Sequence, residues 1–344
     1  MRVPAPRIVA VGDLTADLIF EVTELPIRVG DFQVAEEMHL EPGGSANLLI
    51  LLSRLGASVA ALGTLGTDLW GKQVFQALET EGVDVSLLRR EGTTTVALVL
   101  VDAAGGHSFL GSYGKGEPLV PGDRERRIIA GADALFASGY SLAEARLRDL
   151  TLEALEVAGQ RGVPRFFDPG PAFGTLTPDE RQHALASSDI LLLTEEELRD
   201  LFSTGVEVLL GFGSADRTAA EPAAEFKVQS PATPAATPQA AKSSRAHTVV
   251  VKRGAEGCRV HLEGAEGADV PGLPVTVRDT TAAGDCFDAG YIWAYLKGRS
   301  PEGCARLANC AGAAAAEKLG GGRNVPTIEE LREMISRSGG GIEI

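Results

Sequence analysis

The chain has 344 residues, 44% apolar and 23% charged, a composition that predicts a packed globular core and excludes an intrinsically disordered protein. Lys and Arg number 32 against 47 Asp and Glu, so the formal net charge is −15. This charge excludes a general affinity for nucleic acid or for an anionic membrane surface, and no partner of either kind is expected. An anionic ligand would need backbone N–H groups, a helix N-terminus or a metal ion to hold it.

The sequence shows no sign of membrane insertion or secretion. No apolar run reaches the roughly 18 residues that a membrane span needs. The N-terminus lacks the pattern of a cleavable signal and leads directly into an apolar segment. The four cysteines form no C-x-x-C pair and are expected to be plain thiols of a cytoplasmic protein.

Short apolar runs alternate along the chain with stretches of helical periodicity. The predicted strands are residues 8–11, 59–62, 134–137, 165–167, 190–193 and 248–251. The predicted helices are residues 46–55, 69–80, 142–158, 178–186, 195–202, 284–297, 301–318 and 327–336. This alternation predicts an α/β fold, in which a mostly parallel sheet is covered by helices on both faces and ligands bind at the carboxyl ends of the strands.

Two regions depart from the alternation. Residues 94–101 and 107–113 flank a Gly-containing turn and predict a β-hairpin, and residues 32–40 predict a further strand. Together they are expected to form a small antiparallel sheet outside the main layer. Such a sheet could be a lid over a ligand or a decorative hairpin, and periodicity alone favours neither.

Residues 213–246 form a segment of low complexity. Ala, Pro, Thr, Gln and Glu dominate it, and such a composition buries too little apolar surface to order itself. We expect a disordered surface insertion without a catalytic role.

Residues 278–290 are the most informative segment for chemistry. Small residues, Ala282, Ala283 and Gly284, precede a long apolar helix, and the N–H groups of a first helical turn suit a phosphoryl group. Asp285 would repel a phosphate but would serve as the base for an attacking hydroxyl. The alternative is that Asp285 only caps the helix.

This segment, DTTAAGD at residues 279–285 with a Phe two positions later, resembles the carboxyl-terminal signature of the ribokinase-like (PfkB) carbohydrate kinases. The early G-G-x-x-N signature of that family is present at residues 43–47, and shorter family-like pieces follow in order up to residues 320–326. The resemblance implies one kinase domain over residues 1–344. Its fold would be a ribokinase-like three-layer α/β/α sandwich with a small β-sheet lid, whose strands lie at about 14–40 and 94–113.

The resemblance also implies roles for individual residues. Asp285 would be the catalytic base, and the backbone of Ala282, Ala283 and Gly284 would form the anion hole. Hydroxyl groups of the sugar would be bound by a set of early residues, namely Asp13, Asp17, Gly43, Gly44 and Asn47.

The same resemblance implies ATP and Mg²⁺ as cofactors. The family places Mg²⁺ near an N-x-x-E motif, to which Glu197 corresponds, with Thr194 standing where Asn is usual. The alternative is that residues 195–197 only complement a helix N-terminus. Lys252, Gly254 and Asn309 would lie at the nucleotide, although an exposed strand-end lysine and simple helix packing are the alternatives there.

Many relatives hold a monovalent cation beside the anion hole, so K⁺ is a further implied ligand. The side chain of Asp279 and positions offering backbone oxygens match that site in an oxygen-only set suited to a hard cation. The positions are Asp279, Thr281, Ala315, Gly320 and Asn324.

Two residues depart from the family pattern. Leu49 replaces a small residue after the early signature, so the helix on the sugar side is expected to pack differently. His107 stands where many relatives that bind sugar phosphates carry Arg, which argues against a strongly anionic acceptor. His107 as a plain surface residue is the alternative.

These observations predict an ATP-dependent sugar kinase that transfers the γ-phosphoryl group to a carbohydrate hydroxyl. The alternatives are a nucleoside kinase of the same fold and a non-catalytic sugar-binding or regulatory protein. A dehydrogenase is excluded because no G-x-G-x-x-G follows the first strand. The resemblance adds the expectation of a homodimer paired through the lids.

Overall fold

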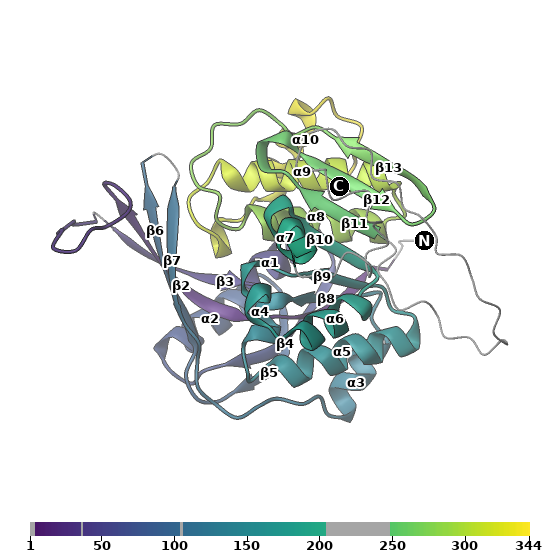
Figure 1. Cartoon of the computed structure of the whole chain (residues 1–344), viewed down its shortest axis with the longest axis horizontal. Coiled ribbons are helices and arrows are strands. Elements are labelled where there is room, and N and C mark those ends of the chain that lie inside the picture. Colours follow the sequence, from purple (N-terminus) through teal and green to yellow (C-terminus); the bar gives the residue numbers. More distant parts are fainter. Residues whose placement is uncertain (1–3, 36, 104–105, 204–247) are drawn as a thin grey trace.

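The computed structural model describes residues 4–35, 37–103, 106–203 and 248–344. The predicted insertion at residues 213–246 lies outside these ranges. Figure 1 shows a large sheet flanked by helices, with a smaller sheet standing beside it. Within the described ranges, no helix is long and apolar enough to cross a membrane.

The larger sheet has nine strands among the described residues, in the order β13-β12-β11-β10-β9-β8-β1-β4-β5. Its strands are β1 (Arg7–Val11), β4 (Ser58–Leu65), β5 (Asp84–Arg90), β8 (Ala134–Ser138), β9 (Arg165–Asp168), β10 (Ile190–Thr194), β11 (Thr248–Lys252), β12 (Cys258–Leu262) and β13 (Ala265–Val270). Neighbours from β5 to β11 run parallel, whereas β12 and β13 form an antiparallel edge. All six predicted strands are confirmed, but β5, β12 and β13 were not predicted.

Alternate residues of the central strands point into two separate cores, because successive side chains of a strand face opposite sides of its sheet. Ile8 and Ala10 of β1 face one core, and Val9 and Val11 face the other. The first core is covered by α1 (Ala46–Arg54), α2 (Leu69–Thr80), α8 (Ala283–Leu296), α9 (Pro301–Ala316) and α10 (Ile328–Arg337). The second is covered by α3 (Asp123–Ala130), α5 (Arg148–Arg161), α6 (Pro178–Ala186) and α7 (Glu195–Ser203). The predicted three-layer α/β/α architecture is confirmed.

The smaller sheet has the strand order β3-β2-β6-β7. It consists of β2 (Leu14–Val22), β3 (Met38–Gly44), β6 (Thr95–Asp102) and β7 (His107–Ser112). The predicted hairpin is confirmed as β6 and β7. The sheet is not purely antiparallel as expected, because β2 pairs with β6 in parallel. The predicted strand at 32–40 is also wrong in its bounds: Phe32 is 88% exposed and unpaired in the sheet, and β3 begins at Met38.

The predicted helix at residues 142–158 is two helices, α4 (Gly139–Ala143) and α5. Glu144 ends α4 with an extended ψ of 113°, and the chain turns inward before α5 begins. The turn buries an ion pair between Glu144 and Arg146. Arg146 also donates to the Thr93 carbonyl (3.2 Å) and to Thr95 Oγ1 (3.2 Å) at the base of the smaller sheet. Hydrophobic periodicity does not reveal a buried ion pair of this kind. The prediction of one helix over this segment was therefore wrong.

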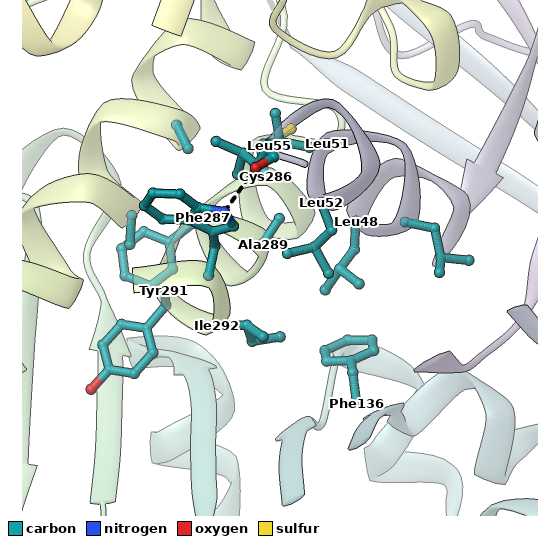
Figure 2. Close-up of a cluster of buried hydrophobic side chains, with 14 of the residues drawn as sticks. Leu48, Leu51, Leu52, Leu55, Phe136, Cys286, Phe287, Ala289, Tyr291 and Ile292 are labelled. Carbon is teal, nitrogen blue, oxygen red and sulfur yellow. Dashed lines mark hydrogen bonds between the residues drawn. The ribbon is translucent and has the colours of Figure 1, made fainter. Parts of the chain in front are cut away.

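Helix α8 is buried between α1 and α9, which is unusual for a surface layer. Figure 2 shows Leu48 and Leu52 of α1, and Leu55 directly after it, in one cluster with α8, with Phe136 of β8 below them. The indole Nε1 of Trp293 in α8 donates to the Leu55 carbonyl at the end of α1 (2.9 Å). This packing fixes the relative position of the two helices whose first turns carry the residues described next.

Candidate active site

Polar side chains gather at the carboxyl ends of the central parallel strands. Thr194 and Lys252 end the paired strands β10 and β11, Asp168 ends β9 and Ser138 ends β8. Asp13 follows β1, and its Oδ1 accepts a hydrogen bond from Ser138 Oγ (3.2 Å). The strand order changes direction at β1, with β4 and β5 on one side and β8 to β11 on the other. Ligands of open α/β sheets bind at such switch points.

The loop before α8 is held in an unusual backbone conformation by a buried carboxylate. Ala282 has a φ of 62°, a left-handed conformation that is costly for a residue with a side chain. Asp279 is fully buried, and its Oδ1 accepts hydrogen bonds from the Thr281 amide (2.9 Å) and hydroxyl (2.8 Å). Its Oδ2 accepts one from the Gly320 amide (2.7 Å). These hydrogen bonds hold the loop that leads into the first turn of α8, where Ala283 and Gly284 lie.

Asp285 lies in that first turn and is bound by Asn47 of α1. The Asn47 Nδ2 donates to Asp285 Oδ2 (2.8 Å), and the Asn47 Oδ1 accepts from the Gly322 amide (2.6 Å). Burial and the nearby Asp168 raise the pKa of Asp285 to about 6, although the Asn47 hydrogen bond and Lys252 act in the opposite direction. A carboxyl group with such a pKa is ionised at neutral pH and still accepts a proton readily, as a general base must.

Asp13 and Asp17 lie close to Asp285 and add to the negative charge. Burial, together with the charge of Asp285, raises the pKa of each to about 7, against the hydrogen bonds that Ser138 gives Asp13 and Thr15 gives Asp17. The Thr15 hydroxyl donates to Asp17 Oδ1 (2.6 Å).

Two glycines leave the space that the carboxylates of Asp13 and Asp17 occupy. A Cβ on Gly43 would lie 1.9 Å from Asp17 Oδ2, and a Cβ on Gly44 would lie 2.7 Å from Asp13 Oδ2. Gly44 also has a φ of +59°. The structure therefore brings all five residues predicted for sugar binding (Asp13, Asp17, Gly43, Gly44 and Asn47) to one place beside Asp285.

A buried lysine connects three elements next to this group. Lys252 Nζ lies 2.9 Å from Asp168 Oδ2 and 3.2 Å from Asp288 Oδ1, on the second turn of α8. We call Asp168, Lys252 and Asp288 the ion cluster. Burial raises the pKa of Asp288 well above its ordinary value, against the effect of Lys252. Burial would lower the pKa of Lys252, but the charges of Asp168, Asp288 and Glu197 outweigh it and raise that pKa. Lys252 is therefore a fixed positive charge, not an exposed strand-end lysine.

Thr194 and Glu197 form a reciprocal cap at the start of α7. The Thr194 amide donates to Glu197 Oε2 (2.8 Å), and the Glu197 amide donates to Thr194 Oγ1 (3.2 Å). Burial, followed by the charge of Asp168, raises the pKa of Glu197, whereas Lys252 lowers it. Glu197 can therefore cap α7 and also bind a metal ion, because its second carboxylate oxygen takes no part in the cap.

The donor set here fits Mg²⁺. Mg²⁺ is usually bound by one or two carboxylates together with water and substrate phosphates, not by a cage of protein ligands. Glu197 and the Thr194 hydroxyl supply oxygens of this kind beside the ion cluster. In the described ranges, no three His, Cys, Asp or Glu residues are placed to hold a metal ion among themselves.

The residues predicted for K⁺ lie near one another but are engaged in hydrogen bonds. Asp279 binds the amides of Thr281 and Gly320, as described above. The Ala315 carbonyl accepts from the Lys318 amide (2.9 Å), and Asn324 Nδ2 donates to the Leu319 carbonyl (3.1 Å). The K⁺ site stays a prediction.

The residues predicted at the nucleotide lie further along the sheet edge. Gly254 follows β11 with a φ of +54°. Asn309 of α9 donates to the carbonyls of Val270 (3.2 Å) and Pro271 (3.1 Å), and it lines a cavity of about 410 Å³.

The sequence-based reasoning missed four charged or polar residues near the site. Asp168 is the last residue of a strand, and Asp288 follows Asp285 by one helical turn. Both signals were present in the sequence. Glu144 and Tyr140 belong to the region of α4, where the periodicity predicted a single longer helix: Tyr140 lies within α4 and Glu144 ends it. Burial and the charges of Asp13, Asp285, Asp168 and Glu197 raise the Tyr140 pKa.

Comparison with known proteins shows the family to which the chain belongs. The family model described as pfkB family carbohydrate kinase matches residues 5–328, and the chain belongs to this family of enzymes, which are kinases acting on alcohol groups. An ATP-dependent ribose-1-phosphate kinase of Halopiger xanaduensis is 28% identical over 96% of this chain and 98% of its own. A ribokinase of Haemophilus influenzae is 27% identical over 95% of this chain and 97% of its own.

The fold is likewise that of solved ribokinases. The structure of Arabidopsis thaliana ribokinase complexed with ribose and ATP superposes with a TM-score of 0.74 at 23% sequence identity, over 96% of this chain and 99% of that chain. The predicted family and fold are confirmed. The predicted homodimer stays a prediction.

Replacing Asp17 tests the electrostatics of the site. Its native pKa of about 7 lies above the value of 3.8 expected without burial, so the ionised group destabilises the fold above pH 7, and this cost fades as the pH falls toward 4. Asp17→Asn should raise the free energy of unfolding by about 2–4 kcal/mol at pH 8, and by less than half as much at pH 5. Urea unfolding at both pH values measures this.

Asp149→Asn, on the exposed start of α5, is the control for loss of one negative charge. If Asp17→Asn destabilises the protein at pH 8, or if its effect equals that of the control, the account of this carboxylate is wrong.

Proposed function

We propose that the protein is an ATP-dependent sugar kinase that transfers the γ-phosphoryl group to a hydroxyl of a small carbohydrate. One observation supports this most strongly: the Asp285 carboxylate lies in the first turn of α8 and is bound by Asn47, beside Asp13 and Asp17. A carboxylate at a helix N-terminus, with acceptors for hydroxyl groups on one side and N–H groups on the other, suits phosphoryl transfer to an alcohol.

In the proposed reaction, Asp285 accepts the proton of the attacking hydroxyl. The acceptor oxygen forms a bond to the γ-phosphorus while the bond from that phosphorus to the bridging oxygen breaks, and ADP leaves. Asp13 and Asp17 orient the other hydroxyls of the acceptor, because carboxylates accept hydrogen bonds from them. The backbone of Ala282 to Gly284 stabilises the negative charge of the transferred group through helix-terminal N–H groups.

Glu197 and Thr194 would hold Mg²⁺ beside the phosphates. When bound, Mg²⁺ supplies positive charge that neutralises the phosphate oxygens. Lys252, Gly254 and Asn309 lie on the side where the nucleotide would bind, with Lys252 closest to the first turn of α8. The small sheet would cover the acceptor and exclude water, since an admitted water would be phosphorylated in place of the sugar.

The charges around Asp285 favour a neutral acceptor. Asp13, Asp17 and the buried Glu144 are all acidic, and the nearby Arg146 is engaged with Glu144 and with oxygens of Thr93 and Thr95. A polyhydroxylated neutral sugar is compatible with this set. Ribose 1-phosphate is a second candidate, because the relative from Halopiger xanaduensis is named for that substrate.

Activity against a panel of acceptors tests the proposed function. ADP release should be measured with pentoses, hexoses, sugar acids, nucleosides and ribose 1-phosphate. We expect turnover with at least one neutral sugar, and a kcat about 10²–10⁴-fold lower in Asp285→Asn, because general-base catalysis contributes factors of that size.

Asp149→Asn is the control and should turn over like the wild type. A wild type that releases no ADP with any acceptor would favour the binding-protein alternative. Turnover with nucleosides alone, or with ribose 1-phosphate alone, would replace the neutral sugar by that acceptor. An active Asp285→Asn variant would remove Asp285 from the role of base.

Replacing Glu197 tests the metal assignment. Glu197→Gln keeps a side chain able to cap α7 but removes the charge, so the Mg²⁺ concentration for half-maximal activity should rise about tenfold. Steady-state assays over a Mg²⁺ titration measure this.

Glu180→Gln is a matched control, because Glu180 forms the same reciprocal cap with Thr177 at the start of α6. It should leave the Mg²⁺ requirement unchanged. An unchanged requirement in Glu197→Gln as well would show that Glu197 serves only as a helix cap.

A further inference from the structure

Burial of the ion cluster costs desolvation free energy, and packing alone does not explain why charged residues stand there. Asp288 has no exposed surface, and the side chain of Lys252 is only 10% exposed. Removing charges from water costs several kcal/mol per ion, and apolar residues of similar size often stabilise a protein as well or better. The rest of β11 is Thr-Val-Val-Val, so an apolar residue would continue the strand at position 252. A buried lysine at this place therefore needs a reason other than stability.

The position of the lysine suggests that reason. A Cβ built on Gly284 would lie 3.8 Å from Lys252 Nζ, so the ammonium is next to the backbone of the first turn of α8. The same ammonium lowers the pKa of Asp285 and that of Glu197. It thus lies between the proposed base, the proposed metal residue and the N–H groups of the anion hole.

The geometry also leaves the lysine able to bind a further oxygen. An ammonium group has three N–H donors. In the described part of the chain they reach three carboxylate oxygens, Asp168 Oδ2 at 2.9 Å and the two oxygens of Asp288 at 3.2 Å and 3.4 Å. Asp288 holds the ammonium against α8 from the buried side, whereas Asp168 is partly exposed, with 17% of its side-chain surface accessible. The 3.4 Å contact to Asp288 Oδ2 is the longest of the three, so its donor can turn toward an oxygen at the start of α8 and leave Asp288 bound through Oδ1.

We propose that Lys252 is a catalytic residue whose ammonium group contacts the transferred phosphoryl group, and that Asp288 is a positioning residue that holds it there. This inference rests on the proposed function. Lys252 forms no covalent bond and releases no proton; it provides a fixed positive charge as negative charge develops on the phosphoryl oxygens. Its role differs from simple nucleotide binding, because the contact strengthens in the transition state.

Steady-state kinetics of three variants test the proposal. Lys252→Met should lower kcat about 100-fold and change the KM for ATP less than about threefold, since a charge acting in the transition state affects kcat. Lys252→Arg should recover part of kcat, because the charge is restored. The double variant Lys252→Met/Asp288→Asn avoids a stranded buried carboxylate, and its kcat should match that of Lys252→Met, because the two residues act as a unit.

Lys297→Met, at the end of α8, is the control for loss of an exposed lysine and should keep wild-type kinetics. Circular dichroism and thermal unfolding identify which variants are folded. The proposal is overturned if either folded Met variant keeps kcat within threefold of wild type, or if the KM for ATP rises while kcat is unchanged. A wild type without phosphoryl transfer to any acceptor would overturn the proposed function and this inference with it, whereas an active wild type with active Lys252 variants would overturn this inference alone.

Discussion

The amide of Asn47 is the interaction on which the arrangement of the site depends. One side of the amide binds Asp285 on α8, and the other accepts from the backbone of Gly322. A Cβ on Gly321 would lie 2.3 Å from the amide oxygen, so the turn can approach Asn47 only as glycine. One buried side chain therefore sets the distance between α1, the first turn of α8 and the turn after α9. The packing of α1 on α8, shown in Figure 2, fixes the helix that carries this amide.

The second constraint is the concentration of negative charge. Seven acidic residues discussed above lie at or near the site, namely Asp13, Asp17, Glu144, Asp168, Glu197, Asp285 and Asp288. The charge of Lys252 opposes four of them, Asp168, Glu197, Asp285 and Asp288. The net charge of the chain is −15, so its overall charge does not attract phosphate. A phosphate group would have to be bound by local positive groups, namely the N–H groups of α8, the Lys252 ammonium and a divalent cation.

The sequence predicted the framework of the fold and the centre of the candidate site. Apolar runs and helical periodicity located the six buried strands, and two signatures pointed to Asn47 and Asp285, residues that the structure joins by a hydrogen bond. What it could not predict depends on contacts between distant segments. Asp168 and Lys252 meet because β9 and β11 end at the same edge of the sheet with β10 between them. The turn after α4 exists because Glu144 and Arg146 pair beneath the small sheet, a contact that no local pattern encodes.

The pH dependence of kcat/KM in the wild type and in Asn47→Ala tests the central claim most directly, because this parameter reports the groups of the free enzyme. The wild type should lose activity below an apparent pKa of about 6 to 7, the range of the Asp285, Asp13 and Asp17 carboxyls, which titrate together. In Asn47→Ala the acidic limb should move to higher pH, since the hydrogen bond that favours the ionised form of Asp285 is lost. The account would be contradicted if the acidic limb lay at the same pH in both proteins and the variant were less active by the same factor at every pH. Asn47 would then contribute to substrate binding alone.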